Sequence, residues 1–109
     1  MKVSWRIFTD CKSDTAVNRV VSTHFNAIGI AATDVSAAPY HKGGFIVTAD
    51  TEHSSESWPH FVVEALSLAQ KSATGWALSG SIAEELDAWS NAARTAGISA
   101  IHIQARAKA

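Results

Sequence analysis

Cysteine, long apolar runs and any excess of charge are nearly absent from this sequence. Cys11 is the single cysteine among 109 residues, so no internal disulfide can form, which favours a reducing compartment. The apolar runs are far shorter than a membrane span, and Lys2 and Arg6 interrupt the N-terminus too early for the apolar core of a signal peptide. The sequence therefore predicts a cytoplasmic protein that does not bind membranes.

Cationic side chains are also too few and too scattered to attract a polyanion. Nine Lys and Arg side chains are scattered among ten Asp and Glu side chains, which gives a formal charge of -1. Nucleic acids and anionic membranes both need clustered cations, so neither is an expected partner. The sequence contains no metal-ligand spacing, phosphate loop or complete catalytic signature, and hence no cofactor is predicted.

Periodic segments with turn or cap residues between them indicate both strands and helices. Strands are expected over residues 3–9, 30–37, 45–49, 76–82 and 101–105, where apolar residues alternate or run together. Helices are expected after caps at Ser13 or Asp14, after Ser54, Ser55 or Ser57, and after the capping box from Ser81 to Glu84. The third helix would present Leu86, Trp89 and Ala93 on one face.

The order of these segments predicts a single α+β domain over residues 1–109. Its first six elements resemble the ferredoxin-like βαββαβ unit, with an additional C-terminal helix and strand and with the helices on one face of the sheet. We expect the first and third strands to be parallel neighbours, so that residues 10–13 and 50–57 emerge at the same edge. The place of the final strand is left open between the sheet edge and the interface of a homodimer.

Acidic side chains in those two loops predict a protein-binding edge. The expected binding residues are Asp10, Asp50, Glu52, Glu56 and Trp58, where the carboxylates would attract a basic surface and the tryptophan would anchor it. A small domain with such an edge and no assembled active site fits an immunity protein or antitoxin that neutralises a basic, nuclease-type toxin. The structural alternative is that the acids are ordinary residues at helix starts and that Trp58 packs on its own helix.

The sequence is also compatible with two other classes of function. An enzyme could use Cys11 as nucleophile and His53 as base, with Asp50 or Glu52 orienting the imidazole, although no local signature fixes that geometry. A small-molecule-binding module at the same strand ends is the other alternative. A metal site from His41, His53 and His60 is not predicted, because their spacing matches no compact ligand motif.

The remaining aromatic and histidine residues are expected to be structural. Trp5, Trp76 and Trp89 each fall in phase with the apolar face of their segment, which predicts that they lie in the core. His24 falls on the apolar face of the first helix, where a hydrogen-bonded core histidine is expected.

Overall fold

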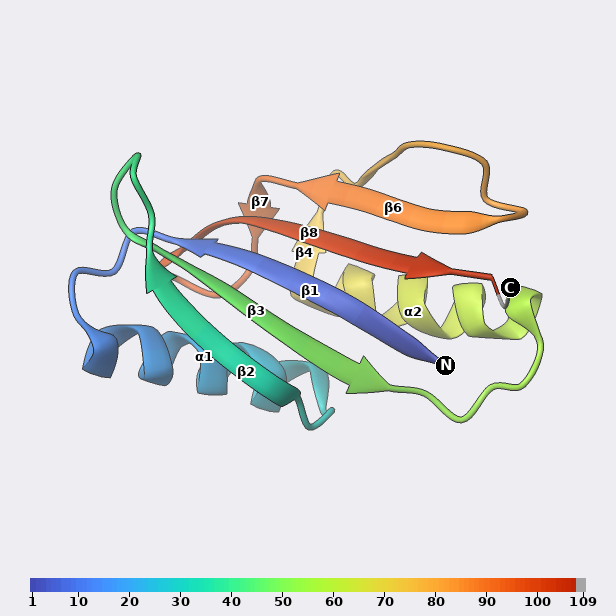
Figure 1. Ribbon diagram of the computed structural model, residues 1–109, viewed down its shortest axis with the longest axis horizontal. Helices are drawn as coiled ribbons and strands as arrows, with labels where there is room; N and C mark the ends of the chain where they lie inside the picture. The colour runs from blue at the N-terminus through green and yellow to red at the C-terminus, as the bar shows by residue number, and fades with distance from the viewer. Residues whose placement is uncertain (108–109) are drawn as a thin grey trace.

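The computed structural model describes residues 1–107 and has a mixed α+β fold (Figure 1). Its elements along the chain are β1 (Lys2–Thr9), α1 (Asp14–Ile28), β2 (Thr33–Pro39), β3 (Phe45–Glu52), α2 (Trp58–Ser72), β4 (Ala73–Thr74), β5 (Ala77–Leu78), β6 (Glu85–Ser90), β7 (Ala92–Ala93) and β8 (Ile98–Arg106). The α+β class predicted from the sequence is confirmed.

One six-stranded sheet has the order β2-β3-β1-β8-β6-β5, and every neighbouring pair is antiparallel. The short strands β4 and β7 form a separate two-stranded pair. This order differs from that of a plain βαββαβ unit, so the prediction is confirmed only at the level of a mixed fold. The expected parallel pairing of the first and third strands is wrong, because β1 and β3 are antiparallel.

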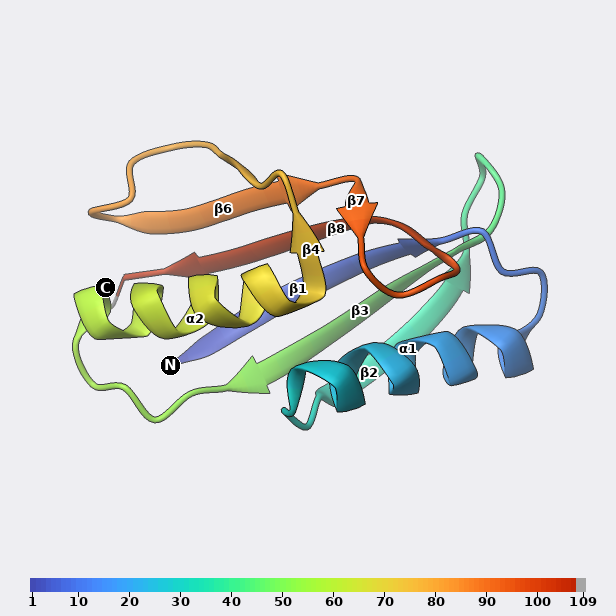
Figure 2. The same ribbon diagram turned by 180° about the vertical axis from the view of Figure 1, so that it is seen from behind.

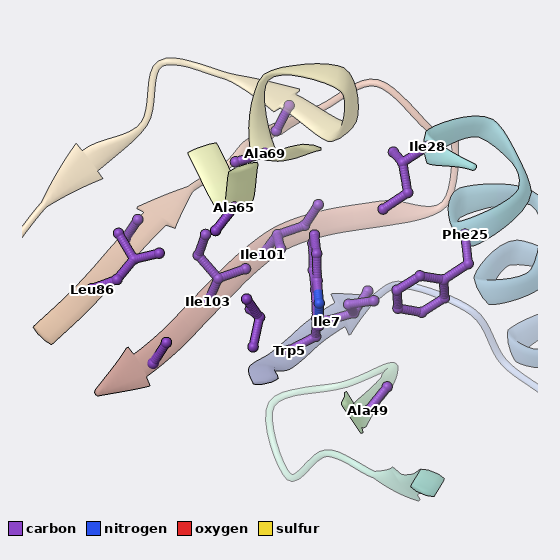
Figure 3. Packing of buried hydrophobic residues seen from close by; sticks show 14 of the residues in the cluster. Trp5, Ile7, Phe25, Ile28, Ala49, Ala65, Ala69, Leu86, Ile101 and Ile103 are labelled. Atoms are coloured by element: carbon purple, nitrogen blue, oxygen red, sulfur yellow. The ribbon is translucent and has the colours of Figure 1, made fainter. Parts of the chain in front are cut away.

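Both helices cover the same face of the sheet, and the opposite face has no helix (Figure 2). The helix-covered side of β1 carries Val3, Trp5 and Ile7, which alternate with the exposed residues Lys2, Ser4 and Arg6. This period of two places a continuous apolar layer between sheet and helices. Trp5 and Ile7 of β1 meet Phe25 and Ile28 of α1 and Ile101 and Ile103 of β8 in this layer (Figure 3).

Local signals determine where the two helices begin and end. The Ser13 hydroxyl accepts from the amide of Ala16 at 3.2 Å, and Gly29 ends α1 in the left-handed region with φ 76°. Ser57 caps α2, whose first turn contains Pro59, where the missing amide hydrogen costs nothing. Within residues 1–107, neither helix combines the length and the apolar composition needed to cross a bilayer.

The predicted third helix is wrong, because its residues form strand β6. Leu86, Ala88 and Ser90 are buried while the residues between them are not, which is the period of a strand. The amides of Glu84 and Glu85 both bond to the carbonyl of Ser81 at 2.9 Å, so the apparent capping box closes a turn instead. Small buried residues hid the alternation, since only Leu86 of the three is strongly apolar.

The segment before β6 also departs from its prediction. Only Ala77 and Leu78 of the strand expected over 76–82 are paired, and Leu78 and Ile82 are exposed. Trp76 is only partly buried, and its indole donates to the carbonyls of Ala69 and Ala73 at 2.9 and 3.1 Å. The tryptophan therefore caps the end of α2 rather than lying in the centre of the core.

The final strand is central in the sheet. β8 pairs with β1 on one side and with β6 on the other, so neither an edge position nor a dimer position describes it. One edge of the sheet is β2, whose seven residues are all exposed, and the other is the two-residue strand β5. The β2 edge has unpaired backbone groups that can accept another strand.

His24 lies in the core, but the hydrogen bonds expected for it are missing. Its side chain is fully buried on α1 and stands edge-on to the ring of Trp5, with ring centroids 5.3 Å apart. Neither ring nitrogen has a hydrogen-bond partner among residues 1–107. Burial disfavours the charged imidazole and lowers the pKa of His24 from 6.5 to about 4. Two unsatisfied nitrogens make this residue costly for the fold.

A first prediction tests the centre of the sheet. Ile7 is fully buried and pairs with Val47 on one side and Ile101 on the other. Ile7→Ala should lower the free energy of unfolding by about 2–5 kcal/mol, because it leaves a cavity under both helices. Urea denaturation measures the change, and Val35→Ala on the exposed edge is the matched control. An unchanged midpoint for Ile7→Ala would contradict the observed register.

A second prediction concerns acid stability. Because the unfolded state takes up a proton at His24 near pH 6.5 and the folded state only near pH 4, stability should fall as the pH drops through this window. The difference in pKa corresponds to about 3 kcal/mol. His24→Leu should remove this part of the pH dependence, whereas His60→Leu, at an exposed position, should keep it. Denaturation series at pH 7 and pH 4 decide the matter, and parallel pH profiles for wild type and His24→Leu would refute the assignment.

Candidate functional site

The two loops expected to share one edge lie at opposite ends of the sheet. Because β1 and β3 are antiparallel, Asp10 and Cys11 follow β1 at the end that also carries the β2–β3 hairpin (Figure 1). Asp50, Glu52 and the segment up to α2 lie at the other end, beside the N-terminus. The structure therefore does not bring Asp10 together with the other four predicted binding residues.

The alternative Cys11–His53–Asp50 arrangement is not assembled either, for the same reason. Cys11 lies near Gly97 at the far end of the sheet from His53. The Nδ1 atom of His53 is 3.0 Å from Glu64 Oε2, so Glu64 takes the orienting position expected for Asp50. Asp50 instead forms an ion pair with Lys2 at 3.6 Å.

His53 belongs to a hydrogen-bond chain that crosses from the core to the surface. The indole of Trp5 donates to Thr51 Oγ1 at 2.9 Å, and this hydroxyl is 2.8 Å from His53 Nε2. Ser55 donates to the second oxygen of Glu64 at 2.5 Å. With the His53 proton on Nδ1, every group has a partner: Thr51 donates to Nε2, and Nδ1 donates to Glu64.

This chain has the order hydroxyl, imidazole, carboxylate, but its burial argues for a structural role. Thr51 is fully buried and the side chain of His53 has no exposed surface, so no substrate can reach the hydroxyl oxygen. The bonds from Ser55 and His53 lower the pKa of Glu64, which keeps it ionised as an acceptor. The backbone of His53 also holds Met1, with its amide on the Met1 carbonyl at 2.8 Å. The network thus fixes the chain terminus and the segment that leads into α2.

Sequence reasoning missed Thr51 and Glu64 as members of this network. Thr51 follows Val47 and Ala49 at a spacing of two and therefore shares their buried face, which was a usable signal. Glu64 falls between the apolar positions of α2 and so is expected on its solvent side, where its side chain is 36% exposed. Only the tertiary packing of α2 against the end of β3 shows that its carboxylate reaches His53.

The end of the sheet where β3 stops is acidic, although not with the predicted residues alone. Besides Glu64, which contacts His53, six of the ten acidic residues lie there, at the end of β3, before α2 and at the start of β6. They are Asp50, Glu52, Glu56, Glu84, Glu85 and Asp87, and we call this set the acidic end. Within residues 1–107, its cationic neighbours are Lys2, Arg106 and the N-terminal amine, each within 4.0 Å of a carboxylate.

Trp58 is partly buried at the start of α2 rather than free. Its indole donates to the carbonyl of Ile82 at 2.7 Å, and its ring stacks on Phe61 with centroids 5.4 Å apart. These contacts tie α2 to the loop before β6. The residue therefore has a structural role whether or not a partner also contacts it.

A second group of aromatic side chains lies on the sheet face that no helix covers. Phe8 is 5.3 Å from Trp89 and 5.6 Å from Tyr40, measured between ring centroids, and Trp89 is 5.9 Å from His102. We call Phe8, Tyr40, Trp89 and His102 the aromatic cluster. The expectation that Trp89 lies in the core is wrong, since it is 39% exposed on the open face.

Polar pairs continue the open face from the aromatic cluster toward the acidic end. His102 Nε2 is 2.8 Å from Asp87 Oδ1, and Gln104 donates to the other oxygen of Asp87 at 3.2 Å. Both bonds lower the pKa of Asp87. Arg6 lies beside His102 in the sheet register and is exposed. The face therefore changes from aromatic to acidic along the direction of the strands.

The three histidines considered as metal ligands do not meet. His41 lies on the hairpin between β2 and β3, while His53 and His60 lie at the opposite end of the sheet. Within residues 1–107, no group of three or more His, Cys, Asp or Glu side chains has the geometry to hold a metal ion.

A third prediction tests whether the buried network of Trp5, Thr51 and His53 stabilises the fold. Thr51→Val keeps the shape of the side chain but leaves the indole of Trp5 and the Nε2 atom of His53 without partners. Unfolding should become easier by about 1–3 kcal/mol, the cost of buried polar groups that lose their hydrogen bonds. Thr48→Val, on the exposed face of the same strand, is the control and should change little. Equal urea midpoints for the two variants would show that the network does not stabilise the fold.

Comparisons with known proteins give no relative from which to transfer a function. No family model, curated protein or solved structure matches the chain. A functional conclusion therefore depends on the surfaces described above, and these are the open sheet face with its aromatic cluster and the acidic end that adjoins it.

Proposed function

We propose that the chain is a protein-binding domain that uses the open sheet face to cover a basic partner. The observation that carries this proposal is the aromatic cluster on a face without helices, next to the acidic end. Trp, Tyr and Arg are the residues most enriched among interface hot spots, and Trp89, Tyr40 and Arg6 lie together there. An immunity protein or antitoxin that neutralises a nuclease-type toxin is the biological role that fits this surface.

Apolar contact area supports binding at the aromatic end of the face. Ala100 is buried and lies opposite Phe8 in the sheet register, yet it is not part of the helix-covered core. The rings of the aromatic cluster are thus held against one another and against the sheet before any partner arrives. Side chains that are already ordered lose less conformational entropy on binding, which favours affinity.

The charge of the acidic end indicates what kind of partner the face would bind. The six carboxylates of the acidic end outnumber its three cationic groups, Lys2, Arg106 and the N-terminal amine. The net negative charge beside the aromatic cluster attracts basic surfaces and speeds their encounter. Aromatic sheet faces can also stack the bases of single-stranded nucleic acid. The adjoining carboxylates oppose a phosphate backbone, and we therefore propose a basic protein rather than an oligonucleotide.

A finer topological proposal belongs with this function. We propose that β1, α1, β2, β3, α2 and β8 form a ferredoxin-like core into which residues 73–93 are inserted. The order β2-β3-β1-β8 within the sheet supports it. The insertion then supplies β6, and with it Trp89, Asp87 and Glu85, to the open face.

The fourth prediction separates the two halves of the proposed surface. A partner recovered from native extract should dissociate about thirtyfold faster from Trp89→Ala, because a hot-spot side chain contributes on the order of 2 kcal/mol. The double variant Glu52→Lys, Glu56→Lys should instead associate more slowly and with weaker salt dependence, because it reverses part of the attracting field. Surface plasmon resonance at low and high salt measures both rates.

The double variant Asp10→Lys, Asp14→Lys is the matched control for charge. It changes the net charge by the same amount at the opposite end of the sheet, and its association rate should stay close to that of the wild type. Binding that is unaffected by Trp89→Ala and by Glu52→Lys, Glu56→Lys would contradict the proposed surface. Saturable binding of a single-stranded oligonucleotide that quenches Trp89 would contradict the proposed partner, and a dimer lost in Trp89→Ala would assign the face to a second copy.

A further inference from the structure

A groove on the helix side of the molecule has a lining that the proposed function does not use. It lies between α1, the C-terminal end of α2 and the segment that joins β7 to β8, and its volume is about 580 Å³. The three segments surround this region in Figure 2. We define the helix-side groove by its cationic residues Arg19, Lys71 and Arg94 and its apolar residues Val20 and Ile28.

Positive charge in this groove is not balanced by the protein. Arg19, Lys71 and Arg94 all line it, and no acidic residue does. Among residues 1–107, none of the three forms an ion pair with a carboxylate. Like charges gathered in one groove repel one another, and a bound anion would relieve that repulsion.

Part of this cationic lining is already fixed in position. The Nε atom of Arg94 donates to the carbonyl of Gln70 at 3.1 Å, and the Arg94 amide donates to the carbonyl of Ser72 at 2.9 Å. These bonds satisfy the C-terminal end of α2 and hold the guanidinium at the groove. Its two terminal nitrogens make no hydrogen bond within residues 1–107, so they are left to bind a ligand in a forked geometry.

Apolar side chains form the wall of the groove on the α1 side. Val20 and Ile28 both line it, whereas His24, which is fully buried against the rings of Trp5 and Phe25, does not. The groove therefore combines cationic side chains with an apolar wall.

We propose that the helix-side groove binds a small organic anion with an apolar body. Its phosphate or carboxylate head would lie against Arg19, Lys71 and Arg94, and its body would pack on Val20 and Ile28. The volume suits a ligand of small-metabolite size. This surface shares no residue with the open sheet face.

Phenyl phosphate is the probe that tests this proposal, because it joins an anionic head to an apolar ring. Titration into nitrogen-15-labelled protein should produce saturable shifts of the amides of Val20, Ile28 and Thr95. Inorganic phosphate should bind more weakly because it lacks the ring, and benzyl alcohol more weakly because it lacks the charge. The absence of saturable shifts at these residues would overturn the proposal.

Substitutions distinguish a specific binding site from a general attraction of the anion to surface cations. Arg19→Gln and Arg94→Gln should each weaken phenyl phosphate binding by about tenfold, the effect of one charge-assisted hydrogen bond. Lys12→Gln and Lys42→Gln remove exposed cations outside the groove and should change it little. An equal loss in both pairs would overturn the proposal. Arg19 is exposed and its side chain makes no hydrogen bond within residues 1–107, so this variant should keep the dispersed spectrum of the folded protein.

Failure of these titrations leaves the kinetics of the open sheet face unaffected, so the two proposals fail separately.

Discussion

The antiparallel pairing of β1 with both β3 and β8 is the constraint on which the rest of the structure depends. It places the segment after β1 and the segment after β3 at opposite ends of the sheet. Cys11 and His53, whose loops the sequence places at one edge of the sheet, are thereby separated. The same pairing aligns the end of β3 with the start of β6, and this alignment gathers the acidic end.

Two histidines in the core show how burial can have opposite consequences. His53 is enclosed by Thr51 and Glu64, so each of its nitrogens has a partner and the cost of burial is offset. His24 stands among aromatic rings without any partner within residues 1–107, and burial lowers its pKa to about 4. The hydrogen bonds of His53 stabilise the fold, whereas His24 contributes only the packing of its ring against Trp5 and Phe25.

The elements that could be predicted are those that local chemistry specifies. Ser13 and Gly29 give the limits of α1, and Ser57 gives the start of α2, because caps satisfy backbone groups within a few residues. β6 could not be recognised in the same way. Leu86 and Trp89 have helical spacing in the sequence, and the strand forms because β8 offers a pairing edge. Such long-range pairing overrides local preference.

The candidate surfaces were harder to predict because each is assembled across the sheet or between layers. Phe8, Tyr40 and Trp89 come from three separate segments, and only the strand register places their rings within 6 Å. The cations of the helix-side groove likewise come from α1, α2 and the segment after β7. Successive side chains of β1 and β6 point to opposite faces of the sheet. The position of a residue in its strand therefore decides on which face its side chain lies. The sheet therefore separates the open face with its aromatic cluster from the helix-side groove, and the two surfaces share no residue.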